Sequence, residues 1–442
     1  MKSWLAGVGL GAVLGGCFIG FSSVAWPDTN TADPRAEVYG KLGIFSEVLA
    51  FVESDYVSEV DNTKVIEAGI NGMLTSLDPH SSYLNPEDYR DIQVDTSGEY
   101  GGLGIEVEPS DGFVKVVAPI DDTPASRAGL KSGDLLTAIN GEQIVGRPLN
   151  DAVKDMRGPP GSDITITVLR DGQDPFDVTL TREVIRPKSV RANLEEGDIG
   201  YVRISSFNER TTLLLEEGLA KILKEAGGRP EGLVLDLRNN PGGLLDQAVS
   251  VSDMFLSGGE VVSTFGRHSS NDRRYNAGPS EVFKGVPIVV LINRGSASAA
   301  EIVAGALQDR ARARVVGVTS FGKGSVQTVM PLGADRGALR LTTARYYTPS
   351  GRSIQGTGIE PDIEIAQERI SEEELERIRS FTEADLPNAL ENEDGSQRRG
   401  PHIPDDQPPE DYDTENGDYQ LDRAYEILRD PTKFASVEGR AG

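Results

Sequence analysis

Apolar residues recur at every third or fourth position in residues 33–75, first in VYGKLGIFSEVLAFVESDYV and then in TKVIEAGINGMLTSL. On a helix this spacing collects the apolar side chains on one face, so the pattern predicts two amphipathic helices. The next stretch, LDPHSSYLNPEDY, has prolines directly after Asp78 and Asn85, which mark turns. We interpret His80, within this stretch, as a loop or packing residue rather than a catalyst.

From Tyr100 the pattern changes to short runs rich in β-forming residues. GGLGIEV, FVKVVAP, LLTAING and DITITVLRDG are typical of strands, and ASRAGL and LNDAVKDMR have a helical pattern between them. These runs predict a compact domain of about ninety residues.

Beyond this domain, strands and helices alternate. DIGYVRISSF, GLVLDLRN, PIVVLIN and ARVVGV have the apolar runs of buried strands. Between them lie the helical patterns TTLLLEEGLAKILKEAGG, LLDQAVSVSDMFL and SAAEIVAGALQD. This alternation predicts a layered α/β core.

The C-terminal part is strongly acidic and rich in Pro, Asn and Asp over residues 384–417, which predicts a disordered linker. After it, YQLDRAYEILRD has Leu421, Ala424, Ile427 and Leu428 on one helical face. We expect this helix to dock on the body of the protein or on another subunit.

The composition limits the kinds of partner. The chain has 442 residues, enough for two or three domains, and its 70 acidic against 44 basic residues give a formal net charge of -26. This charge repels nucleic acid, so no nucleic-acid partner is expected. The one cysteine, Cys17, excludes disulfides and Cys-based metal sites, and we expect no metal and no cofactor.

The N-terminal segment, residues 1–32, has the pattern of an export signal. Lys2 precedes a long apolar run, and Ser-Val-Ala at 23–25 suits a signal peptidase. The segment predicts an exported, periplasmic protein, with the segment either cleaved or retained as an inner-membrane anchor. Lipidation at Cys17 is a weaker alternative.

Ser298 is the first candidate for chemistry. In NRGSASAAEIVAGALQD, residues 293–309, it follows a buried strand and stands at the first turn of a helix, where free backbone N–H groups favour developing negative charge. Helix caps are the alternative interpretation of Ser296 and Ser298. Since none of the three histidines has a catalytic setting, a nucleophilic Ser298 needs another base.

Two glycine-rich loops supply the other candidates. In SFGKGSVQ, Lys323 lies between two glycines, and burial near Ser298 would lower its pKa and make it a general base. In VLDLRNNPGGLL, the amide of Gly242 or Gly243 could form an oxyanion hole with that of Ala299. The alternative for this second loop is a plain strand-to-helix connection.

Residues 97–183 resemble a circularly permuted PDZ domain of bacterial proteases, on the basis of GGLGIEV and SRAGLKSGDLLTAINGEQI. The resemblance implies capture of an extended peptide C-terminus by strand addition at 104–107. The residues that would bind it are Gly102, Leu103, Gly104 and Ile105. Arg157 could sense the terminal carboxylate, although a solvated helix-end arginine is the commoner meaning of such a residue.

Taken together, the motifs LDPHSSYL, LDLRNNPGGLL, GSASAAEIVAGALQD, FGKGSVQ and YYTPSGRSIQGTGIEPD resemble the carboxyl-terminal processing, or tail-specific, proteases of the S41 serine peptidase class. The resemblance implies a crotonase/ClpP-like α/β protease core over residues 184–365, with the PDZ domain inserted after a helical region, 33–96. Residues 366–442 would then be a C-terminal extension.

The same resemblance implies roles for single residues. Ser298 falls on the nucleophile, Lys323 on the base and Gln327 on the glutamine that orients the lysine. Asp309 falls on an acidic position of open role, where a structural carboxylate is an equal alternative. Ala300 departs from the Ser or Thr that the family often has, which should affect packing more than chemistry.

The leading hypothesis is therefore an exported serine endopeptidase that binds protein C-termini and cleaves near the tail through a Ser-Lys dyad and an acyl-enzyme. One alternative is an inactive PDZ scaffold, and a weaker one is an acyl-CoA enzyme. The expected partners are protein substrates with exposed tails. A homo-oligomer and an adaptor protein are compatible with the sequence, which decides neither.

Overall fold

The computed structural model of the protein describes residues 34–110, 112–195, 198–333, 335–371, 382–400, 402–413 and 416–430. The predicted signal or anchor segment, residues 1–32, lies outside them. Among the described helices, none is both long and apolar enough to cross a membrane. The chain divides into two compact units, residues 1–66 and 67–442.

The first unit contains the long helix α1 (Pro34–Asp55) and the beginning of α2 (Asn62–Thr75), the two helices that the apolar spacing predicts. Asn62 Nδ2 donates a hydrogen bond to Glu53 Oε1 at 3.0 Å and links the two helices. Most of the large apolar side chains of α1 are exposed.

The LDPHSSYL stretch contributes a strand as well as the predicted turns. Strand β1 (Ser82–Leu84) pairs antiparallel with β18 (Ala338–Tyr347). Helix α3 (Pro86–Ser97) follows, and the Asn85 side chain caps it by accepting two backbone hydrogen bonds. Because β1 exists only through its pairing with a strand over 250 positions away, the local pattern shows only the turns.

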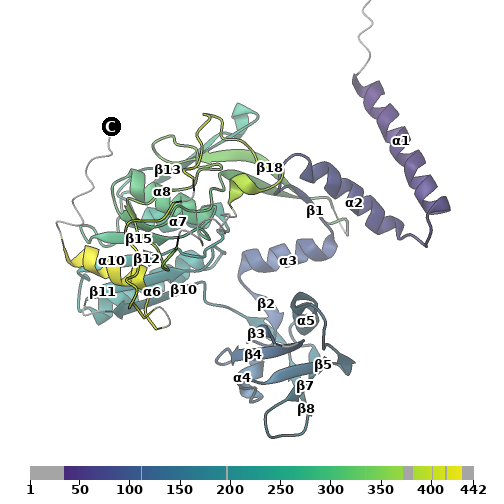
Figure 1. Ribbon diagram of the computed structural model, residues 1–442, viewed down its shortest axis with the longest axis horizontal. Coiled ribbons are helices and arrows are strands. Elements are labelled where there is room, and N and C mark those ends of the chain that lie inside the picture. Colours follow the sequence, from purple (N-terminus) through teal and green to yellow (C-terminus); the bar gives the residue numbers. More distant parts are fainter. Residues whose placement is uncertain are drawn as a thin grey trace, which may run out of the picture. The chain divides into compact units, whose positions relative to one another are not determined.

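A β-rich domain follows, as the short apolar runs predict (Figure 1). Its antiparallel sheet has the order β3-β4-β5-β7-β8, β6 pairs with β5, and β2 pairs with β9. Val116, Leu136 and Ile166 are fully buried in its core, together with Ala152 of α5. The elements are β2 (Tyr100–Gly102), β3 (Ile105–Ser110), β4 (Phe113–Pro119), α4 (Pro124–Arg127), β5 (Leu135–Ile139), β6 (Glu142–Gln143), α5 (Leu149–Met156), β7 (Asp163–Leu169), β8 (Phe176–Thr181) and β9 (Glu183–Ile185).

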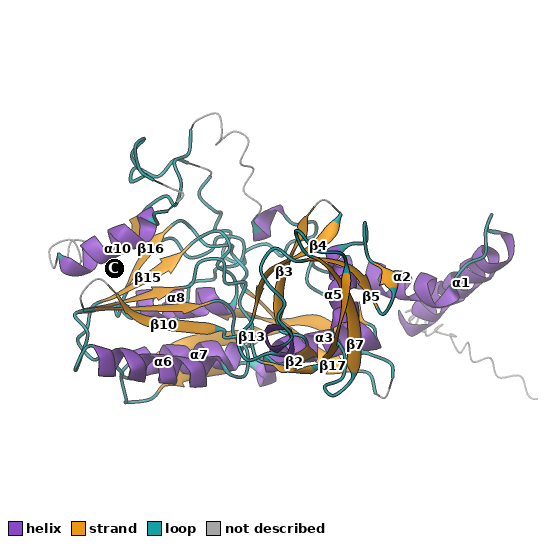
Figure 2. Cartoon of the chain, turned by 90° about the horizontal axis from the view of Figure 1, so that it is seen from below, coloured by secondary structure: helices purple, strands orange, loops and turns teal. Residues whose placement is uncertain are grey.

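The predicted α/β core is built on a six-stranded sheet of order β10-β11-β12-β15-β16-β19, parallel from β11 onward. Helices α6, α7 and α8 pack on one face and α10 on the other (Figure 2). Leu233 and Leu235 face the first layer and Val234 the second, so every position of β12 is apolar until Asp236. The elements are β10 (Val190–Glu195), β11 (Ile199–Ile204), α6 (Thr211–Glu225), β12 (Gly232–Asp236), α7 (Leu245–Phe255), β15 (Ile288–Ile292), α8 (Ala299–Asp309), β16 (Arg314–Gly317), β19 (Ile363–Glu364) and α10 (Tyr419–Arg429).

A second sheet, of order β1-β18-β13-β14 with β17 paired to β18, lies beside this core. Its remaining strands are β13 (Gly259–Gly266), β14 (Arg273–Ala277) and β17 (Ser325–Pro331), and the short 3-10 helix η1 (Ser269–Asn271) joins two of them. Strand β17 starts two residues after Lys323, so this sheet carries the candidate base.

The acidic segment 384–417 is not the disordered linker that its composition predicts, at least in its described part. Arg398 donates hydrogen bonds to the carbonyls of Thr319 and Ser320, and Glu393 accepts one from Tyr347. The segment has few apolar residues, but its polar side chains bind defined groups of the core. Composition cannot reveal such specific partners.

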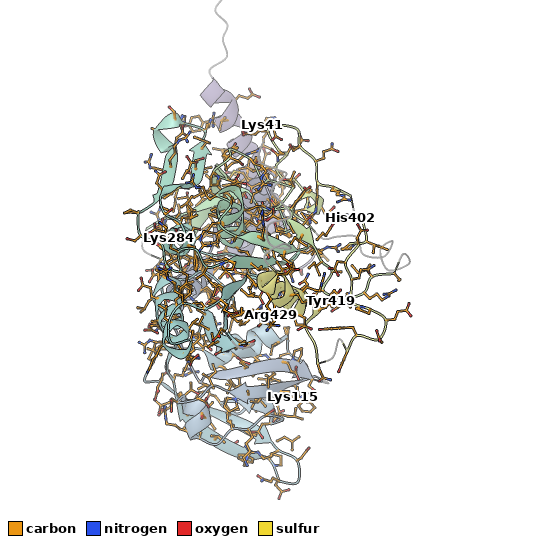
Figure 3. The ribbon with its side chains drawn as sticks, turned by 90° about the vertical axis from the view of Figure 1, so that its left-hand side faces the viewer. Lys41, Lys115, Lys284, His402, Tyr419 and Arg429 are labelled. Carbon is orange, nitrogen blue, oxygen red and sulfur yellow. The ribbon has the colours of Figure 1, made fainter. Side chains whose placement is uncertain are left out.

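The terminal helix docks on the body of the protein, one of the two alternatives that its apolar face left open. Figure 3 shows Tyr419 and Arg429 at opposite ends of α10. Ala424, Ile427 and Leu428 are buried against the sheet.

Candidate active site

Ser298 lies at the junction of β15 and α8, at the N-cap of the helix. Its backbone has φ 55° and ψ -114°, a conformation that costs a non-glycine residue about 1–3 kcal/mol and persists only when the surroundings hold it. The Ser298 amide donates to Glu301 Oε2 at 2.7 Å. Ser296, by contrast, bonds through its hydroxyl to the Leu237 carbonyl at 2.8 Å, as a buried turn residue.

Glu301 connects the two candidate catalytic loops. Its fully buried carboxylate accepts hydrogen bonds from the Ser298 and Lys323 amides, the Gly322 amide and the Ser320 hydroxyl, at 2.6 to 2.9 Å. Burial raises the pKa of Glu301 to about 7, while the four donors act in the opposite direction. Glu301 has no predicted role from the sequence motifs, although a Glu three positions after Ser298 is the capping-box spacing.

Lys323 lies in the loop before β17, between two glycines that the packing requires. Gly322 has φ 100°, and a Cβ on Gly324 would lie 2.7 Å from the Gln355 amide nitrogen. Burial lowers the pKa of Lys323, and the positive charge of Arg340 adds to this effect. Within the described part of the chain, the Lys323 amine makes no hydrogen bond or ion pair.

Ser298 and Lys323 line the same cleft, which has a volume of about 1320 Å³. Gln327 on β17 lines it as well, and its amide nitrogen donates to Ser325 Oγ and Thr342 Oγ1 at 3.0 and 3.2 Å. The structure brings together the three residues predicted for catalysis, without a direct hydrogen bond between any two of them among the described contacts.

The glycine turn after β12 packs directly against the nucleophile loop. A Cβ on Gly242 would lie 2.8 Å from Ser298 Cβ, so only glycine fits there. The Gly242 amide already donates to Asn240 Oδ1 at 2.9 Å. Because the amides of Gly243 and Ala299 donate no hydrogen bond within the described residues and both line the cleft, they are the better-placed pair for an oxyanion.

Tyr346 is a second residue of the site without a role predicted from the sequence. Its buried side chain lines the cleft, and its hydroxyl finds no hydrogen-bond partner of ordinary geometry among the described residues. Burial raises the pKa of Tyr346 well above its ordinary value, and the nearby Ser298 side chain acts in the opposite direction. The phenol therefore stays protonated next to Ser298.

Asp309 does not line the cleft. At the end of α8, it accepts hydrogen bonds from the Ser350 amide and hydroxyl and forms an ion pair with Arg352 at 3.1 Å. These are the contacts of a structural carboxylate, which was one of the two interpretations. The three histidines do not line the cleft either.

A buried ion network lies at the end of β12, just before the glycine turn in sequence. Arg238, two residues after β12, forms hydrogen bonds with Asp236 and with Asp418 at the N-cap of α10, each at 2.7 Å in the shortest contact. Gln420 accepts a further hydrogen bond from Arg238. The sequence gives no sign of this pairing because Asp418 lies 180 positions away.

The β-rich domain offers the predicted peptide-binding edge. Strand β3, which begins at Ile105, pairs only with β4 among the described strands, so its other edge is open. Leu103 is buried, and Gly104 has φ 75° with Thr123 so close that a Cβ would lie 2.3 Å away. Gly102 ends β2.

Arg157, predicted as a carboxylate sensor, follows helix α5 as its C-cap. Its guanidinium lies 4.7 Å from the centre of the Tyr100 ring, and its buried Nε has no hydrogen-bond partner among the described residues. Arg157 is therefore packed on an aromatic ring rather than free in solvent. Its role in binding a carboxylate stays a prediction.

Comparison with known proteins agrees with these features. Residues 198–365 match the model of peptidase family S41, residues 115–170 match a PDZ domain, and residues 23–88 match the N-terminal domain of the activating protease CtpB. A carboxy-terminal-processing protease of Bartonella bacilliformis is 47% identical over 419 residues, 94% of each chain.

Two further similarities are more distant. A Staphylococcus aureus protein named "Probable CtpA-like serine protease" is 37% identical over 73% of this chain and 64% of its own length. Among solved structures, a photosystem II D1 C-terminal processing protease is 29% identical, covering 78% of this chain and 98% of that one, with a TM-score of 0.44.

Proposed function

The chain belongs to peptidase family S41 and is a serine-type carboxy-terminal-processing protease with a PDZ domain; from this premise, we propose that it cleaves through a Ser298–Lys323 dyad and an acyl-enzyme. The observation that carries the proposal is Glu301. One buried carboxylate binds the backbone amides of both Ser298 and Lys323, so the nucleophile and the base are held by the same group.

In the first half of the proposed reaction, neutral Lys323 takes the proton of the Ser298 hydroxyl as Oγ attacks the scissile carbonyl carbon. The amides of Gly243 and Ala299 stabilise the resulting oxyanion. The tetrahedral intermediate collapses when the C–N bond breaks and the Lys323 ammonium gives its proton to the leaving amine. This step leaves an ester on Ser298.

In the second half, water attacks the ester and gives one proton to Lys323. Collapse of the second tetrahedral intermediate breaks the bond to Oγ, which takes that proton back and releases the new C-terminal carboxyl group. Burial of Lys323 supports this role because it lowers the pKa of the amine and so increases the neutral fraction. Gln327 would orient the amine through its amide oxygen.

The substrate part of the proposal concerns the PDZ domain. Protein C-termini add as a strand to the open edge of β3, with the terminal carboxylate near Gly102, Leu103 and Gly104. We also propose export of the protein to the periplasm, because of the signal-like pattern of residues 1–32.

Purified Ser298→Ala, Lys323→Ala and Lys323→Arg proteins test the dyad on a peptide with a free apolar C-terminus. Arg keeps the charge but cannot act as a base at ordinary pH, so it is the matched control for Lys323→Ala. All three variants should lose activity by about 1,000-fold or more. If they release product as fast as the unchanged protein, another group performs the chemistry, and equal inactivity of all four proteins would favour the inactive scaffold.

A further inference from the structure

A buried carboxylate from the C-terminal extension lies next to the Lys323 loop. Glu383 opens the 3-10 helix η2 (Glu383–Asp385), and its side chain is 1% exposed. His80 Nε2 lies 2.8 Å from Glu383 Oε2, and Gln355 Nε2 donates to Glu383 Oε1 at 3.0 Å. Three segments that are far apart in sequence therefore meet at one carboxylate, and the reaction proposed above uses none of them.

Hydrogen bonds lead from Glu383 to both sides of Lys323. The Glu383 amide donates to the Phe321 carbonyl at 3.3 Å, two residues before the lysine. On the other side, the Gln355 oxygen accepts from the Gly324 amide at 3.0 Å while its nitrogen is bonded to Glu383. Glu383 and Gln355 thus bind the loop at Phe321 and Gly324. Glu301 binds the amides between these two positions.

The surroundings of His80 are equally specific. The His80 amide donates to Asp78 Oδ1 at 2.9 Å, and the His80 carbonyl accepts from Arg340 Nε at 3.1 Å. Asp78 in turn accepts from Thr342 on β18. His80 therefore ties the LDPHSSYL stretch to the sheet that carries the candidate base, and it presents its ring to Glu383.

We propose that Glu383 and His80 are positioning residues for Lys323, and that the C-terminal extension is therefore a working part of the active site. The proposal rests on the function proposed above, in which Lys323 is the base. Glu383 sets the place of the Lys323 loop through Phe321 and Gln355, and His80 fixes the orientation of the Glu383 carboxylate. Arg398, bonded to the Thr319 and Ser320 carbonyls, holds the same loop from a second point of the extension.

The charges around Lys323 affect its pKa, and therefore the pH profile of the reaction. A residue with a purely structural role would leave this profile unchanged. Four charged groups act on the Lys323 amine: Glu383, Glu301 and Asp78 raise its pKa, and Arg340 lowers it. Among these groups Glu383 has the largest effect. Loss of the Glu383 charge should therefore lower the pKa of Lys323 and move the acidic limb of the rate profile to lower pH.

The test compares kcat/KM against pH for the full-length protein, Glu383→Gln, His80→Gln and the control Glu391→Gln. Glu391 belongs to the same extension, but its side chain is exposed. Glu383→Gln should reduce the plateau rate by about tenfold, because the new side chain keeps only one acceptor atom for His80 and Gln355 and so positions the loop less well. Relative to its own plateau, its rate at mildly acidic pH should rise by about two- to fivefold.

His80→Gln should also reduce the plateau, but without a shift of the acidic limb to lower pH, because the Glu383 charge remains. Circular dichroism and thermal unfolding show whether each variant folds. If Glu383→Gln does not fold, His80→Gln still tests the proposal. The proposal is overturned if folded Glu383→Gln, or folded His80→Gln in its place, has the same profile as Glu391→Gln. An active Lys323→Ala would instead overturn the proposed dyad, so the two failures are distinguishable.

Discussion

The PDZ domain and the protease core both contain buried charged residues, but these residues have different neighbours. In the PDZ domain, the Asp134 side chain is 1% exposed, pairs with Arg170 and accepts from the Lys131 amide, so it closes a turn that does not line the cleft. In the core, Glu301 binds the Lys323 loop, and Arg238 binds Asp236 at the end of β12, just before the glycine turn in sequence. The position of buried charge, more than its presence, therefore indicates function in this protein.

Among the buried charged residues of the two regions, the largest effect is expected from Glu301→Gln. A glutamine can accept at only one of its two terminal atoms, so two of the four buried donors would lose their partner, at about 1–3 kcal/mol each. We expect at least about a hundredfold loss of kcat. The measurement is peptide cleavage together with urea unfolding, and Glu217→Gln on the exposed face of α6 is the control.

Unchanged cleavage by folded Glu301→Gln would show that the two catalytic loops do not depend on this carboxylate. The comparison between the two regions would then lose its main support.

Arg238→Met should have the next largest effect. It leaves the fully buried Asp236 without its main partner, which typically costs about 3–5 kcal/mol. Urea unfolding should show this loss, and kcat should fall by about tenfold because the glycine turn moves. Asp418→Asn, which removes only the charge of Asp418 and leaves the Asp236 and Gln420 contacts of Arg238, should be milder in both measurements, and the idea fails if it is more severe.

Asp134→Asn tests the PDZ side of the comparison. It should reduce the stability of the PDZ domain by about 1–3 kcal/mol and leave kcat on short peptides unchanged. Although burial opposes ionisation, the Arg170 and Lys131 contacts hold the pKa of Asp134 below its ordinary value of 3.8. The stabilisation is therefore full above pH 3.8 and is lost as the pH falls through the lower, folded-state pKa. Unfolding at neutral and at acidic pH would check this, and a strong loss of kcat would contradict the contrast.

Arg157→Gln should have the smallest effect. If Arg157 assists carboxylate capture, KM should rise by about two- to fivefold for a peptide with a free C-terminus and stay constant for its C-terminal amide. Steady-state kinetics on the matched peptide pair measures this difference. An equal change for both peptides would assign Arg157 to packing on Tyr100 alone.

The sequence predicts those parts of the molecule that depend on local pattern. The helices α1, α2 and α10, the β-rich domain and the alternating core follow from apolar spacing, and the loops of Ser298 and Lys323 follow from glycine-rich motifs. Positions 242 and 324 require glycine because another segment of the same chain passes so close that a Cβ would not fit.

The rest of the site depends on contacts between distant segments. His80 was interpreted as a loop or packing residue, and its contact with Glu383 spans 303 positions. The composition of the acidic extension predicts disorder, and this prediction is wrong for the described part because a composition average contains no information about contacts such as that of Arg398 with the Ser320 carbonyl. Glu301 was missed even though it is close in sequence to Ser298, because its other three donors come from the Lys323 loop.

The most direct test of the central claim is a mass measurement of the protein quenched in acid during turnover of a peptide ester. We expect an acyl adduct that maps to Ser298, is absent from Ser298→Ala, and forms more slowly as Lys323 becomes protonated at lower pH. An adduct on another residue, or rapid cleavage by Ser298→Ala, would contradict it.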